Sequence, residues 1–259
     1  GANIETLVLT AGAAQNGIGN GLANTLVGNG FANSLAGGAA ADTLVGGDGA
    51  DTLDGGTETD SLLGGLGDDV YQVEGANDVI VEAADEGIDR VIVSAGTAYT
   101  LGANLEHLVL AGATLLNGTG NALANQITGN VSANALTGDA GADTLLGGDG
   151  GDTLDGGADT DSLVGGLAND TYIIDGDAPD TILELAGGGI DRVLLAAGTA
   201  YTLDAEVENL LLTGAGAQNG SGNGLANRIV GNAIANSLFG AAGADTLEAG
   251  AGNDTLEGG

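Results

Sequence analysis

The chain has 259 residues and a formal net charge of −33, from 36 acidic and 3 basic residues. This charge excludes nucleic acid as a partner, because phosphate binding needs clustered Lys and Arg. No apolar stretch is long enough to predict membrane insertion, and the absence of cysteine excludes disulfides and thiolate metal sites. The 52 glycines and 2% aromatic content exclude a bulky core, whereas 43% hydrophobic residues favour a thin, repeated core of small aliphatic side chains.

A nine-residue period begins at Gly19 and runs through residue 72, giving six nonapeptides from GNGLANTLV to GGLGDDVYQ. The eighth residue of each is large and apolar: Leu26, Leu35, Leu44, Leu53, Leu62 and Tyr71. One inward residue between two outward ones predicts a three-residue strand, and the Gly-, Asn- and Asp-rich residues before it predict a turn. Two nonapeptides then make one coil of an all-β parallel solenoid, in which residues two nonapeptides apart stack.

The same pattern returns with a period of about 101 residues: GIDRV at 87–91 recurs at 189–193, and NGIGNGLANTLVGN at 16–29 has counterparts at 117–130 and 219–232. We expect one continuous solenoid over residues 1–259, with about fourteen coils at two nonapeptides each. Its parts are an initial strand (1–18), a first β-roll (19–72), a β connector (73–119), a second β-roll (120–173), a second β connector (174–221) and a third β-roll (222–259) that stops partway.

The sixth residue of most nonapeptides is an aspartate, and stacking places these aspartates above one another. Two carboxylates ~5 Å apart repel by about 3 kcal/mol at an effective dielectric near 20, so a counter-ion is needed. Oxygen ligands from carboxylates and glycine-rich turns favour calcium, whereas zinc and copper lack an adequate ligand set. The sequence therefore predicts several calcium ions, about four or more, as the cofactor. The predicted ligands are Asp51, Asp69, Asp152, Asp170, Asp42, Asp60, Asp143, Asp161, Asp245 and Asp254.

The first two nonapeptides of each roll carry asparagine instead of aspartate at the sixth place: Asn24, Asn33, Asn125, Asn134, Asn227 and Asn236. Neutral amides can stack without a counter-ion. We expect these nonapeptides to form calcium-free coils that keep the same backbone path and act as a template for the aspartate coils.

The motif G-G-x-G-x-D-x-(large apolar)-x, as in GGDGADTLD at 46–54, resembles the RTX or hemolysin-type calcium-binding repeat. The resemblance implies a right-handed parallel β-roll with calcium between turns on both edges, in a large secreted bacterial protein exported by a type I system. The turns led by Gly46 and Gly64 match fully. Elsewhere Ala40, Glu58 and Ala168 replace the fourth glycine, and Asp139 replaces the second.

This resemblance implies a calcium-dependent structural module of a secreted or cell-surface bacterial protein, such as an adhesin, a surface-layer protein or a fibre-forming protein. The alternative is a C-terminal folding and secretion module of an extracellular protease, lipase or mannuronan epimerase. Catalysis by the chain itself is not expected, because it has no Cys nucleophile and no credible Ser–His pair. End-to-end self-association into fibres or sheets stays open, because an uncapped solenoid presents free strand edges.

Ice binding is a third alternative, since Thr25, Thr43 and Thr52 share one outward strand position. Ser34 and Ser61 interrupt that row, which argues against it.

Overall fold

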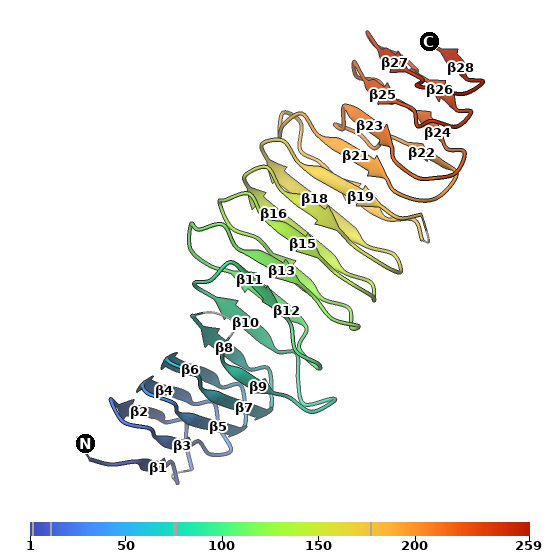
Figure 1. The fold of residues 1–259 in the computed structure, drawn as a ribbon. Helices are drawn as coiled ribbons and strands as arrows, with labels where there is room; N and C mark the ends of the chain where they lie inside the picture. Colours follow the sequence, from blue (N-terminus) through green and yellow to red (C-terminus); the bar gives the residue numbers. More distant parts are fainter. Residues whose placement is uncertain (2, 11, 75–76, 177) are drawn as a thin grey trace. The chain divides into compact units, whose positions relative to one another are not determined.

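The computed structural model describes residues 1–259 except 2, 11, 75–76 and 177. In this described part all regular elements are β-strands, and no helix long and apolar enough to cross a membrane occurs there. The chain divides into two compact units, Gly1–Ile127 and Thr128–Gly259, and each is a stack of parallel strands (Figure 1). The described residues form 28 strands at two per coil, which confirms a parallel β-solenoid of about fourteen coils.

Alternate strands of the first unit fall into different sheets, with one sheet in the order β1-β3-β5-β7-β9, a second containing β2-β4-β6-β8-β10-β12, and a pair β11-β13. The strands are β1 (Thr6–Val8), β2 (Asn16–Asn20), β3 (Thr25–Val27), β4 (Ser34–Ala39), β5 (Thr43–Asp48), β6 (Thr52–Thr57), β7 (Ser61–Leu66), β8 (Val70–Val73), β9 (Val79–Val81), β10 (Arg90–Val93), β11 (Ala98–Thr100), β12 (His107–Leu110) and β13 (Asn117–Thr119), and β14 (Gln126–Thr128) crosses the boundary.

The second unit repeats this arrangement, with the orders β16-β18-β20, β15-β17-β19-β21-β23-β25-β27 and β22-β24-β26-β28. Its strands are β15 (Ala135–Thr137), β16 (Thr144–Asp149), β17 (Thr153–Asp155), β18 (Ser162–Leu167), β19 (Thr171–Ile174), β20 (Thr181–Leu183), β21 (Arg192–Leu195), β22 (Ala200–Thr202), β23 (Asn209–Leu212), β24 (Asn219–Ser221), β25 (Arg228–Val230), β26 (Ser237–Phe239), β27 (Thr246–Glu248) and β28 (Thr255–Glu257).

The core of each unit is the predicted apolar ladder. Leu26 pairs in register with Leu44, and Leu44 with Leu62, so residues 18 apart stack along one sheet. The large residues at the eighth place, from Leu26 to Tyr71 and from Ile127 to Tyr172, are at most 1% exposed. This register confirms that two nonapeptides make one coil, and it fixes which turns lie above one another.

Strand length varies from three to six residues, which corrects the prediction of three-residue strands throughout, and it does not follow the turn type alone, because β17 has three residues before an aspartate turn. β3 ends at Val27, before an asparagine turn, whereas β5, β6 and β7 each continue for six residues into the glycine pair of an aspartate turn. The position of the threonine row also differs from expectation. Thr25 pairs with Thr43, but Thr52 lies in the other sheet, beside Ser34.

The stretch after residue 73 adds further coils to the same sheets. Arg90 pairs in register with both Val70 and His107, so β8, β10 and β12 are neighbours. Val91 and Leu108 are fully buried on this path. The register survives although the spacing between stacked residues is no longer 18, because inward side chains and ladder hydrogen bonds, not turn length, set the pairing of parallel strands.

Candidate metal centre

The sixth-position aspartates stand directly before the strands, and a backbone hydrogen bond links each to the coil that follows. The Asp42 N–H donates to Asp60 Oδ1 at 2.7 Å, and the Asp51 N–H donates to Asp69 Oδ1 at 2.6 Å. In the second unit the Asp143 N–H donates to Asp161 Oδ1 at 2.8 Å, and the Asp152 N–H donates to Asp170 Oδ1 at 2.7 Å. The structure therefore brings the four expected aspartate pairs together.

These eight aspartates are at most 2% exposed, and each uses only one of its two carboxylate oxygens. Among the described residues the other oxygen is buried without a hydrogen-bond partner: Oδ2 of Asp42, Asp51, Asp60, Asp69, Asp143, Asp152, Asp161 and Asp170. A buried charged oxygen that lacks a partner costs more than the 1–3 kcal/mol of a neutral group, so a single unpaired atom is already expensive. Their repetition along two columns indicates that a partner of opposite charge belongs there.

The first glycine of each aspartate turn leaves space next to these unpaired oxygens. A β-carbon at Gly46 would collide with Asp51 Oδ2 and lie 2.6 Å from the carbonyl oxygen of Gly64 in the neighbouring coil. A β-carbon at Gly147 would meet Asp152 Oδ2 and the Gly165 carbonyl in the same way. A carboxylate oxygen and a backbone carbonyl therefore face one small space, which is a ligand set suited to a hard cation.

Burial changes the acidity of the stacked carboxyl groups. It raises the pKa of Asp51 and of Asp152 to about 6, and the pKa of Asp69 and of Asp170 to about 7, while the backbone N–H donors oppose the shift. Burial also raises the pKa of Asp42 and Asp60. The ionised form of these six carboxylates is thus unfavourable until a cation compensates its lost hydration.

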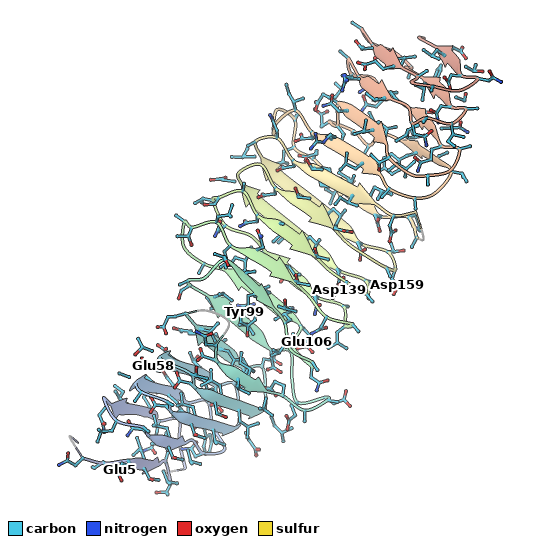
Figure 2. The ribbon with its side chains drawn as sticks, in the orientation of Figure 1. Glu5, Glu58, Tyr99, Glu106, Asp139 and Asp159 are labelled. Carbon is cyan, nitrogen blue, oxygen red and sulfur yellow. The ribbon has the colours of Figure 1, made fainter. Side chains whose placement is uncertain are left out.

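The turns that depart from the motif keep the geometry of the glycine turns. Ala40, Glu58 and Ala168 take the place of the fourth glycine and hold φ values of 72, 84 and 80°, in the left-handed region. Asp139 takes the place of the second glycine with φ 79°. Figure 2 shows Glu58 and Asp139 at turns. The substitutions therefore strain the backbone and leave the aspartates of these turns in place.

The asparagine turns differ from the aspartate turns, which corrects the expectation of one shared backbone path. Among the described residues none of the second or fourth places in these turns has a positive φ. Instead, the Asn20 amide Nδ2 donates to the Ile4 carbonyl oxygen at 2.8 Å and the Asn24 Nδ2 donates to the same oxygen at 3.1 Å. Asn24 Oδ1 accepts from the Asn20 N–H at 2.7 Å. Amide donors thus satisfy the carbonyl of the preceding coil without an ion.

Asp245 and Asp254 occupy the corresponding places in the third roll and are only half-buried. Asp245 Oδ1 accepts from the Asn227 N–H and Asp254 Oδ1 accepts from the Asn236 N–H, both at 2.9 Å. The aspartate columns therefore begin on an asparagine coil in this roll as well.

The aspartate columns continue into the connectors, which the nonapeptide period did not predict. The Asp69 N–H donates to Asp89 Oδ1 at 2.8 Å, and the Asp60 N–H donates to Asp78 Oδ1 at 3.0 Å. In the second unit Asp191 and Asp180 take these places. The signal was present, because each of these aspartates is followed two residues later by a buried or half-buried aliphatic residue. Asp78 even keeps the spacing of 18 residues, whereas the other three lie 19 to 21 residues from their partners, outside the strict period.

Two groups of three acidic residues result where the columns enter the connectors. Asp69, Glu82 and Asp89 form one group, and Asp170, Glu184 and Asp191 form the other. Within each group one carboxylate oxygen from each residue lies within 4.8 Å of those of the other two, as the ligands of one metal ion would.

The family model of the RTX calcium-binding nonapeptide repeat matches residues 18–53, 45–80, 119–154, 137–172 and 221–259, which together make up more than half of the chain. No protein with a curated description matches the chain. The chain therefore belongs to the RTX family, as a β-roll module built from calcium-binding nonapeptide repeats.

Proposed function

We propose that the stacked aspartates bind calcium between neighbouring coils. The proposed ligands are Asp51, Asp69, Asp152, Asp170, Asp42, Asp60, Asp143, Asp161, Asp245 and Asp254. The observation that carries this proposal is the series of buried Oδ2 atoms with no partner beside glycine turns. Calcium accepts six to eight oxygen ligands and mixes carboxylates with backbone carbonyls, whereas magnesium requires stricter octahedral geometry and keeps its waters.

Calcium binding is proposed to drive the folding of the rolls. Residues 37–72 contain eight acids and no base, and residues 138–173 repeat that composition, so repulsion opposes the metal-free fold. An affinity of about 10⁻⁴–10⁻³ M, the range of extracellular modules, would leave the chain unfolded where calcium is scarce and fold it outside the cell.

The folded module is proposed to serve a structural role in a secreted or cell-surface bacterial protein, such as an adhesin, a surface-layer protein or a fibre-forming protein. The recurrence of a unit of about 101 residues supports this role, because repeat arrays extend by adding identical units. The uniform ladder of aliphatic side chains supports it too, since each coil buries its apolar residue against its neighbours.

Far-ultraviolet circular dichroism during a calcium titration tests the proposal. We expect the β signal of the chelated chain to be weak and to rise cooperatively with calcium, and magnesium at the same concentration to have little effect. Sedimentation of the same samples reports whether the modules also associate into fibres or sheets. A chelated chain that is fully ordered and equally heat-resistant would sink the proposal.

Counting the bound ions tests the ligands themselves. We expect the double variant Asp51→Asn with Asp152→Asn to bind fewer calcium ions than the parent in native mass spectrometry. Asp48→Asn with Asp149→Asn is the matched control, because these aspartates are exposed and the charge change is equal. Equal losses in both variants would show that bulk charge, not the columns, holds the ions.

A further inference from the structure

The last nonapeptide of each roll differs from the others by a tyrosine at the eighth place. The Tyr71 hydroxyl accepts from the Gly64 N–H at 2.7 Å and donates to Glu82 Oε1. In the second unit the Tyr172 hydroxyl accepts from the Gly165 N–H at 2.8 Å and donates to Glu184 Oε1. A leucine could not make these contacts, so the tyrosine holds a connector glutamate against the last coil of its roll.

The glutamate that Tyr71 holds completes a buried group of three carboxylates. Asp69 and Asp89 are each 1% exposed and Glu82 is 9% exposed. Asp69 Oδ2 and Glu82 Oε2 are buried and have no hydrogen-bond partner in the described part of the chain. A β-carbon at Gly64 would collide with Asp69 Oδ2 and the Tyr71 hydroxyl and lie 2.6 Å from Glu82 Oε1, so the group converges on the space left by that glycine.

No basic side chain compensates these carboxylates in the part of the chain that the structure describes. The ion pair found there joins Arg228 to Glu248 at 2.9 Å and involves neither group. In each group two buried aspartates and a less buried glutamate lie together without a cation, so they repel one another and lose hydration, which together cost several kcal/mol. An arrangement this costly occurs twice with the same residue types, in two separate units.

We propose that Asp69, Glu82 and Asp89, and likewise Asp170, Glu184 and Asp191, each form a calcium site distinct from the sites between aspartate coils. The latter sites offer carboxylates from the columns and backbone carbonyls, whereas each terminal site adds a third carboxylate from the connector. Because calcium affinity rises with the number of charged ligands and with rigidity, the terminal sites bind calcium more tightly. The bound ion fastens the connector to the last coil and so closes the roll.

The glutamates provide the first test, since they belong to the terminal sites and not to the columns. We expect the chain with Glu82→Gln and Glu184→Gln to lose its two tightest calcium ions in calorimetric titration and native mass spectrometry, while the weaker ions remain. Glu257→Gln, at an exposed strand end, is the control with an equal charge change per site. Unchanged number and affinity of the tightest ions in the double variant would overturn the inference.

Terbium luminescence provides a second test that keeps all carboxylates. Terbium replaces calcium, and the chain has four tyrosines and no tryptophan to sensitise its emission. We expect the first two equivalents of terbium to be sensitised by Tyr71 and Tyr172. Emission should therefore be lost in Tyr71→Phe with Tyr172→Phe and kept in Tyr99→Phe with Tyr201→Phe, and the reverse pattern would contradict the inference.

The same tyrosine variant separates a positioning role from simple packing. Groups that orient a metal ligand contribute about 10–100-fold to affinity. We expect Tyr71→Phe with Tyr172→Phe to weaken the two tightest calcium ions at least about ten-fold and to leave the others unchanged. The inference adds to the proposed function and fails separately: a chain that binds no calcium disproves both, whereas loss of the column sites alone leaves the terminal sites standing.

Discussion

The asparagine turns over 19–36 and the aspartate turns over 37–72 connect stacked strands with the same period, but their side-chain polar groups find partners in two different ways. Both have nine residues per strand and turn, and both pair with strands 18 residues away. In the asparagine turns, side-chain amides donate to the carbonyls of the preceding coil. An ionised aspartate has only acceptor oxygens, and in the described aspartate turns over 37–72 Oδ2 is buried without a hydrogen-bond partner, as at Asp51. When an aspartate replaces the asparagine, the turn loses a donor that the chain itself supplies, and the buried carboxylate needs a cation from solution instead.

The backbone conformation also differs between the asparagine turns and the aspartate turns. Aspartate turns have positive φ at the second and fourth places, as at Gly47 and Gly49, whereas the asparagine turns among the described residues do not. Glycine reaches this region without penalty, and it leaves the carbonyl oxygens uncovered. A turn that must present oxygens to an ion is therefore rich in glycine, and a turn that is closed by amides can carry Leu22 or Phe31 at the fourth place.

Removing calcium should have the largest effect, because it should destabilise the aspartate turns much more than the asparagine turns. Each ion present at 100 times its dissociation constant stabilises the fold by about 2.7 kcal/mol, so the loss of about four ions is comparable with the whole stability of a typical domain. In hydrogen exchange with a chelator, we expect amides of 37–72 to lose protection while those of 19–36 keep part of theirs. Equal protection of the two segments would disprove the template role of the asparagine coils.

Lowering the pH should replace part of the effect of calcium. Burial raises the pKa of Asp51 from 3.8 to about 6 and that of Asp69 to about 7, so the folded chain holds protons that the unfolded chain has released. The free energy of unfolding therefore falls as pH rises through this window.

We expect the folded state of the chelated protein to be favoured by several kcal/mol more at about pH 5 than at about pH 7.5, so that far-ultraviolet circular dichroism shows a stronger β signal at the lower pH. Saturating calcium should remove or reverse this trend, because it keeps the carboxylates ionised. A chelated protein that gains stability as pH rises would contradict the assigned shifts.

Single exchanges of amide and carboxylate test the comparison at one residue. Asn33→Asp removes the donor from Asn33 Nδ2 to the Gln15 carbonyl, which is 2.9 Å away, and adds a charge in a turn without the glycine geometry. We expect a loss of about 1–3 kcal/mol with and without calcium.

Asp51→Asn should behave differently from Asn33→Asp. With calcium we expect it to destabilise the fold, and with a chelator to be neutral or stabilising, because it removes a buried charge. Chemical denaturation of both variants in the two conditions measures this change of sign. The same sign in both conditions would mean that Asp51 does not act through calcium.

Restoring a glycine should give the smallest effect. Ala40 holds φ 72°, which costs an L-residue about 1–2 kcal/mol, while glycine adds about 0.5–1 kcal/mol of chain entropy to the unfolded state. We expect Ala40→Gly to raise the free energy of unfolding by up to about 1 kcal/mol. Ala41→Gly, without positive φ, is the control and should be neutral or destabilising by thermal denaturation in calcium.

The sequence by itself determined the period, the all-β solenoid, the ladder from Leu26 to Tyr71 and the stacking of Asp51 on Asp69. These follow from spacing alone, because a strict repeat of nine fixes which side chains turn inward and which lie one coil apart. Tertiary structure decided what the repeat does not encode. It placed Glu82 against Tyr71, Asp89 next to Asp69, and the Asn20 side-chain amide in a hydrogen bond with the Ile4 carbonyl. These contacts join segments whose spacing differs from 18 residues, so they depend on how the irregular connectors pack against the neighbouring coil.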